Sequence, residues 1–192
     1  MLAVCLRNQH SEKWLALSEH KIMALHGSIT ENKKGAEAFK RAMKEIEMWN
    51  ARVGFFENSK YESGEPVAYI AAIQEFGYEA GNLPSRSFMR TTQKEKRHEW
   101  AMMAQKGFTS VAAGRMSAES VYKKLGMAGQ AAVVKKIRSI KSPALKESTV
   151  DTRKRRKANG GKGATMGIRK PLVDTGVMLA AVNHQVVNGH AK

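Results

Sequence analysis

The alternation of apolar and polar positions predicts most of the secondary structure of this chain. Between residues 35 and 49, apolar side chains recur at steps of three and four with lysine and glutamate between them, which is typical of an amphipathic helix. Residues 52–56 are β-prone and precede a polar loop at residues 58–65, so a strand is expected there. The positions that carry the helical spacing are Phe39, Met43, Ile46 and Trp49.

A second helix is predicted over residues 67–76, and it is apolar on nearly every side. Pro66 suits the first turn of this helix and Gly77 suits its end. A helix without a polar face is buried on more than one side, in a core or in a subunit contact. Its apolar positions are Val67, Tyr69, Ile70, Ile73 and Phe76.

Two longer helices are predicted after a loop at residues 81–87. Phe88 begins the first, and Ser117 is a good N-cap for the second. Gly126 and Gly129 fall inside the second helix and are expected to bend or interrupt it. The apolar faces consist of Trp100, Met103, Ala104, Phe108 and Val111 in the first helix and Val121, Leu125, Ala128 and Ala132 in the second.

The two ends of the chain are patterned less regularly. A short helix is predicted over residues 177–182, capped by Asp174-Thr175-Gly176, with a closing strand at residues 185–187. Residues 1–27 are mixed in character, and Met1 and Met23 are both reasonable starts. The opening has no basic start and no small-residue cleavage site of a signal peptide, and no apolar run approaches the about 18 residues that cross a bilayer. A short amphipathic helix near the start is suggested by Trp14, Leu15, Leu17, Ile22 and Leu25.

Charge is concentrated in one tract. The chain has 33 Lys and Arg against 17 Asp and Glu, a net charge of +16. Residues 135–171 hold 13 of the basic residues and two acidic ones, which is +11 of that total. Residues 153–163 lack an apolar anchor and are expected to form a projecting, poorly packed loop. No aromatic residue follows residue 122, so base stacking is disfavoured, and the tract suits a DNA backbone or an acidic protein.

The residues that usually carry catalysis do not form a recognisable constellation. The chain has only two aspartates, Asp151 and Asp174, whereas two-metal phosphoryl chemistry uses several clustered carboxylates. None of the six histidines has zinc-ligand spacing, and the single Cys5 permits no internal disulfide. We therefore expect no enzyme, no cofactor and no metal site, and no substitution of Glu75, His98, Asp151 or Asp174 that acts through lost chemistry.

Three pieces of the chain, in this order, resemble a family of neck and tail-completion proteins of long-tailed bacteriophages. The first is residues 52–56 and 67–77 with the polar loop between them. The second, residues 83–90, is similar to the family's I-P-x-R-P-F-M-R, with Ser87 in place of the usual proline. The third joins residues 142–150, through a lysine-rich stretch, to residues 170–179, and is similar to the family's P-L-x-x-S-T and K-P-L-x-D-T-G-x-L.

The resemblance implies a structural virion protein that is assembled in the host cytoplasm. It would form a ring, with six copies favoured, in the head-to-tail connector and would let DNA pass toward the tail. Its partners would be other neck and tail proteins such as a connector, a tail terminator or the tail tube. The alternatives are a tail terminator or minor tail protein, and a basic DNA-binding protein in packaging or regulation.

The expected architecture is an α+β fold with a small antiparallel sheet packed with helices, a long helical excursion over residues 88–140 and a basic loop. Residues 1–30 would be an N-terminal extension, residues 31–187 the domain with a basic insertion at about 115–170, and residues 188–192 a tail. Subunit or partner contacts are expected from Tyr69, Ile73, Phe76, Arg86, Phe88 and Arg90. Contacts with DNA or an acidic partner are expected from Arg153, Lys154, Arg155, Arg156, Lys157 and Lys162.

Overall fold

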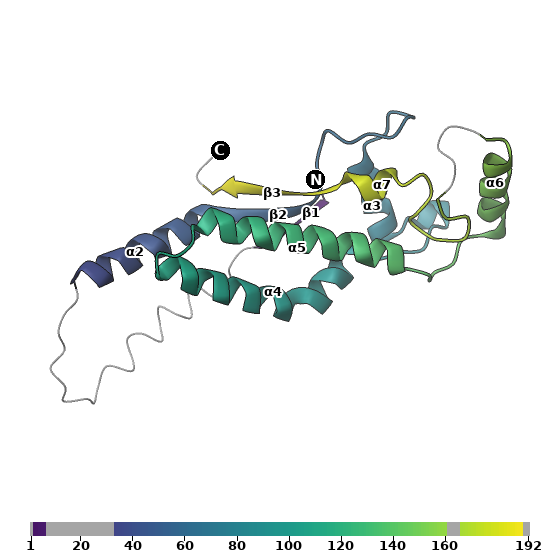
Figure 1. The fold of residues 1–192 in the computed structure, drawn as a ribbon. Helices are drawn as coiled ribbons and strands as arrows, with labels where there is room; N and C mark the ends of the chain where they lie inside the picture. Colours follow the sequence, from purple (N-terminus) through teal and green to yellow (C-terminus); the bar gives the residue numbers. More distant parts are fainter. Residues whose placement is uncertain (1, 7–32, 161–165, 190–192) are drawn as a thin grey trace.

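A three-stranded antiparallel sheet is the organising layer of the computed structural model, which describes residues 2–6, 33–160 and 166–189 (Figure 1). Its strands are β1 (Leu2–Leu6), β2 (Trp49–Phe55) and β3 (Val182–Asn188), with β2 in the centre. The expectation that residues 1–30 lie outside the domain is therefore wrong for β1, in which Cys5 pairs with Arg52 of β2. The short helix suggested near Trp14 lies outside the described residues.

Helices cover one side of the sheet. Helix α2 (Lys33–Met48) runs directly into β2. The predicted excursion is a hairpin of α4 (Met89–Ala112) and α5 (Ala118–Ser139), in which α5 lies against β2 and β3 (Figure 1). Ser117 caps α5 as expected, because its side chain accepts a hydrogen bond from the amide of Ser120.

The glycines of α5 do not interrupt it, contrary to expectation. Gly126 lies against the His184 ring of β3, and a Cβ at this position would approach the ring Cδ2 to 2.7 Å. His184 is fixed there by a 2.6 Å hydrogen bond between its Nδ1 and Oε1 of Gln130, also on α5. Gly126 therefore allows a helix to approach a strand closely, which only the tertiary contact reveals.

The core divides into two apolar clusters along the length of the molecule. The first joins the sheet to the start of α4, the end of α5 and α3 (Val67–Phe76), and the second joins α2 to the remainder of the α4–α5 hairpin. Phe55 and Phe88 meet edge to face at 6.0 Å in the first cluster. Fully buried side chains of the first cluster include Phe55, Val67, Ala71, Phe88 and Ile137, and the second contains Ile46, Ala51, Val121, Tyr122 and Leu125.

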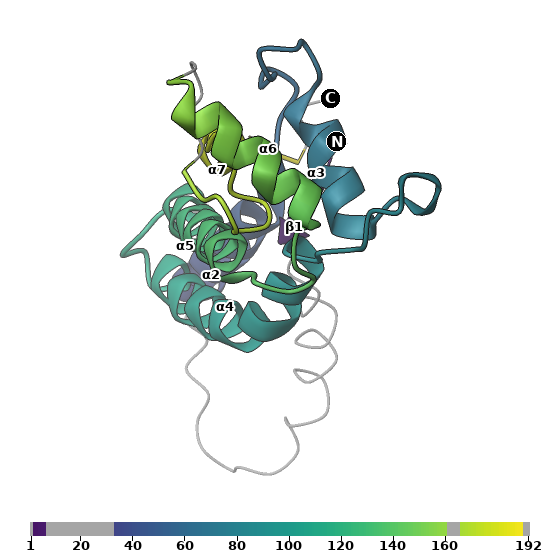
Figure 2. The same ribbon diagram turned by 90° about the vertical axis from the view of Figure 1, so that its right-hand side faces the viewer.

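The remaining elements gather at the end of the molecule where α5 ends (Figures 1 and 2). They are α3, the 3-10 turn η1 (Glu79–Gly81), α6 (Glu147–Ala158) and α7 (Val177–Ala181). The observed bounds of α3 are those predicted, with Pro66 before it and Gly77 (φ 84°) after it. The α+β architecture is confirmed.

The expected basic loop is wrong for residues 153–158, which belong to α6. Glu147 in the first turn of α6 and three cations in its last turn both complement the helix dipole. Lys154 and Asp151 form an ion pair across one turn at 3.0 Å, while Val150 and Arg153 face inward and are buried. Residues 161–165 lie outside the described residues.

Candidate functional site

A buried carboxylate, Glu75, joins the end of α3 to the beginning of α4. Its side chain is 1% exposed and accepts hydrogen bonds from the backbone amides of Phe88 and Met89 at 2.7 and 2.8 Å. The hydroxyl of Ser87 donates at 2.6 Å, and the amide of Arg90 at 3.1 Å. Glu75 thus satisfies the free amides in the first turn of α4 from a different helix and places a negative charge at the positive end of the α4 dipole.

Arg90 completes this junction. Its Nε lies 3.0 Å from Oε1 of Glu75, its Nη2 donates to the Glu75 carbonyl at 3.0 Å, and its guanidinium lies 4.7 Å from the centre of the Phe76 ring. Burial acts to raise the pKa of Glu75, but the hydrogen bonds from Ser87, Met89 and Arg90 outweigh burial and hold this pKa below its ordinary value. The carboxylate is therefore charged and fully engaged, which is unlike a group kept ready to exchange protons.

Arg86 connects the second resembling piece to the third. It is 4% exposed, and its Nε and Nη2 donate to the carbonyls of Pro143 and Ala144 at 2.9 and 3.1 Å. Its Nη1 donates to Gln74 at 3.2 Å. The expected contact of Arg86 with a subunit or partner is wrong, because its side chain is buried and donates to carbonyl and amide oxygens of its own chain. Phe88 is likewise fully buried in the core and offers no surface to a neighbour.

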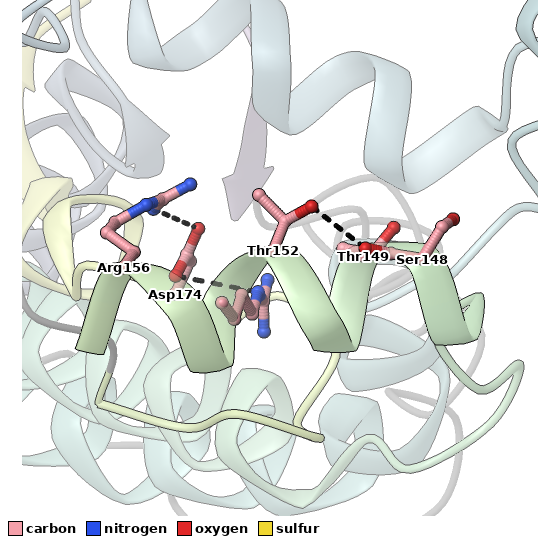
Figure 3. Close-up of a pocket in the computed structure, with 6 residues that line it drawn as sticks. Ser148, Thr149, Thr152, Arg156 and Asp174 are labelled. Carbon is pink, nitrogen blue, oxygen red and sulfur yellow. Dashed lines mark hydrogen bonds and ion pairs between the residues drawn. The ribbon is translucent and has the colours of Figure 1, made fainter. Parts of the chain in front are cut away.

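A second arginine cluster holds α6 against the loop that precedes α7. The Nη1 of Arg153 lies 2.9 and 2.8 Å from the carbonyl oxygens of Gly167 and Lys170. Asp174 forms ion pairs with Arg156 at 3.0 Å and with Arg153 at 3.5 Å (Figure 3). The segment expected to cap the last helix, Asp174-Thr175-Gly176, supplies the N-cap of α7 through Gly176, and no side-chain hydrogen bond caps this helix. Arg153 is structural and is not available for DNA.

The remaining cations of the tract lie at the end of α5, in the loop that follows it, on α6 and in the loop before α7, and we call them together the basic surface. Of the 13 lysine and arginine residues in the tract 135–171, five are ion-paired within the chain and Lys162 lies outside the described residues, which leaves seven. All seven are exposed and have no carboxylate partner among the described residues. The basic surface consists of Lys135, Arg138, Lys141, Lys146, Arg155, Lys157 and Lys170.

A second surface is formed by α3 and the two loops that flank it, and we call it the α3 surface. Tyr69 and Phe76 are 60% and 59% exposed on α3, with the half-buried Ile73 between them, and Tyr78 follows at 55%. The subunit contact expected from Tyr69, Ile73 and Phe76 stays a prediction. The flanking loops carry exposed glutamates and a single lysine, Lys60; the glutamates are Glu57, Glu62, Glu65 and Glu79.

No catalytic arrangement is found in the described part of the chain. Its histidine, cysteine and acidic residues include no group of three that could hold a metal ion, and no described helix is long and apolar enough to span a membrane. A hollow beside α6 is lined by hydroxyls, two arginines and Asp174 (Figure 3). Thr152 donates its hydroxyl proton to the Ser148 carbonyl at 2.9 Å, and Asp174 is ion-paired, so the hollow holds no nucleophile beside a free base.

Glu75 and Arg153 have structural roles that the sequence pattern did not reveal. The sequence signal for Glu75 is a carboxylate near the end of a mostly apolar helix, and this signal does not identify its partners. Arg153 could not be separated from its four basic neighbours, because its carbonyl acceptors lie 14 or more positions later in the chain.

Comparisons with known proteins return no match. No family model, no curated protein and no solved structure is significantly similar to this chain.

Proposed function

We propose that this chain is a structural protein of the head-to-tail connector of a long-tailed bacteriophage, where it forms a ring that completes or joins the tail and lets DNA pass. The observation that carries the proposal is the meeting of the three resembling pieces at one end of the molecule. Glu75 of the first piece binds residues 87–90 of the second, Arg86 of the second binds Pro143 and Ala144 of the third, and Asp174 closes the third on itself.

These contacts support a scaffold role over a catalytic one. Each buried polar side chain of the three pieces forms a hydrogen bond with the backbone or an ion pair. The three motifs therefore stabilise the fold of this end of the molecule, while the aromatic rings of α3 stay exposed on its surface. Exposed aromatic residues beside charged groups are common in protein–protein contacts.

Loss of the gene from the phage that encodes this chain tests the proposal. Electron microscopy of the lysate should show filled heads and separate tails in place of complete virions. Tails of uncontrolled length would instead indicate the tail-terminator role, and normal virions would contradict both. Supplying Tyr69→Asp or Ile73→Asp subunits should fail to restore joining, whereas the wild-type chain should restore it.

A second candidate is a basic DNA-binding protein acting in packaging or regulation, and the seven unpaired cations of the basic surface favour it. Such a protein binds duplex DNA as an unassembled monomer, with an affinity that falls steeply with salt. Titration of duplex DNA against the purified chain at two salt concentrations separates the candidates, because the connector role does not require tight binding by the free monomer.

A further inference from the structure

The basic surface and the α3 surface are complementary to each other. The basic surface carries seven positive charges without an ion-pair partner among the described residues, and the α3 surface carries four exposed glutamates against Lys60. The exposed Arg90 also lies over the Phe76 ring, but its charge is paired with the buried Glu75. In a chain of net charge +16, the α3 surface is a local exception. Opposite potentials on two patches guide one patch onto the other and disfavour like-charged partners.

The two patches occupy different sides of the same end of the molecule. In Figure 2, α6 lies nearest the viewer, while the loops that flank α3 project to the top and to the right of the view. The ion pairs within α6 and between α6 and Asp174 do not involve the glutamates of the α3 surface. Neither patch neutralises the other inside one chain, so each remains available to a second molecule.

We propose that one copy of this chain binds another head to tail, with the basic surface of one copy on the α3 surface of the next. The rings of Tyr69, Phe76 and Tyr78 would form the apolar centre of the contact, and the glutamates and lysines its charged rim. Duplex DNA fits the cations but leaves the exposed rings and the glutamates without a partner. A second copy covers both surfaces at once.

The geometry of such a contact has a direct consequence for assembly. Because the two patches differ, the contact is heterologous, and its repetition closes into a ring or continues as a filament. The inference rests on the proposed ring and names the surfaces that build it. Most cations of the basic surface then contact the neighbouring subunit. Their exposure in the isolated chain therefore does not indicate how tightly the assembled ring binds DNA.

Two charge-reversal variants test the contact. One carries Glu62→Lys and Glu79→Lys on the α3 surface, and the other carries Lys141→Glu and Lys146→Glu on the basic surface. Each variant, purified after nuclease treatment, should be monomeric by mass photometry, whereas the wild-type chain should form oligomers that dissociate as salt is raised. Circular dichroism melts check that both variants are folded.

Mixing the two variants gives the decisive result. Each variant keeps one unaltered patch, so a heterologous contact predicts a dimer that grows no further. A chain with all four reversals should stay monomeric, because both of its patches then carry more cations than carboxylates. The matched control reverses two exposed cations at the other end of the hairpin, Lys106→Glu and Arg115→Glu, and should keep the oligomers.

Three outcomes would overturn the inference: a wild-type chain that is monomeric at every salt concentration, oligomers that disappear on nuclease treatment, or oligomers that survive both charge reversals. The proposed function is judged separately by particle joining. Loss of joining without self-association would refute the contact alone, and self-association with normal virions from the gene deletion would refute the function alone.

Discussion

Replacing Glu75 with glutamine should destabilise the protein far more than an isosteric change at the surface. Its carboxylate accepts from two amides on Oε2, and from Ser87 and from the amide and Nε of Arg90 on Oε1. A glutamine has one acceptor oxygen, so its amide group would face donors on one side. Charge-assisted hydrogen bonds contribute about 1.5–3 kcal/mol each and neutral ones about 1, and the helix dipole adds up to about 2.

The expected cost is about 3 kcal/mol, after the side chain reorients to keep its oxygen on the Phe88 and Met89 amides. For a chain of this size that loss lowers the melting temperature by about 6–12 °C. Urea unfolding followed by circular dichroism measures it. The matched control is Glu99→Gln on α4, whose ion pair with Lys96 is exposed and should contribute less than about 1 kcal/mol.

The pH dependence of the same variant gives an independent check. The pKa of Glu75 in the folded chain lies below its ordinary value of 4.5, so its stabilising contribution is complete above that value. The contribution is lost as pH falls through the lowered folded pKa. The difference in free energy of unfolding between the wild type and Glu75→Gln should therefore be constant near neutrality and shrink below about pH 4.5. Equal losses for Glu75→Gln and Glu99→Gln, or a difference that grows in acid, would refute the role assigned to this carboxylate.

Three further substitutions have defined outcomes. Arg86→Ala leaves two carbonyls of the loop before α6 without their donors and should lower the free energy of unfolding in urea by about 2–4 kcal/mol. Stability equal to the wild type would contradict the role of Arg86 in holding this loop. Gly126→Ala should destabilise by about 1–3 kcal/mol because its Cβ meets the His184 ring, and in a His184→Ala background the same change should become neutral or stabilising. Asp174→Asn should weaken the attachment of α6, seen as faster hydrogen exchange in that helix, while Asp151→Asn should not; unchanged exchange in both would refute the attachment.

The local pattern of the sequence determined the place of several elements and the ends of a few. The bounds of α3, the cap of α5 and the place of the closing strand follow from residue spacing, Pro66, Gly77 and Ser117, because helix and strand periodicity and end chemistry act over a few neighbouring positions. Composition also determined that the charge excess lies in one tract. Whether the resemblance of the three pieces reflects a shared function stays a prediction.

Tertiary structure decided which polar residues are structural and which are free. Glu75 finds its partners 12–15 positions away, Arg86 at 12 and at 57–58 positions, and Arg153 at 14–21 positions. No local rule specifies such pairs. The same kind of long-range contact explains why the expected basic loop is wrong for α6. Arg153 can be buried on this helix because its guanidinium donates to the carbonyls of Gly167 and Lys170 in a distant loop. Charge can be counted along a chain, but whether a charge is available depends on partners that only folding brings near.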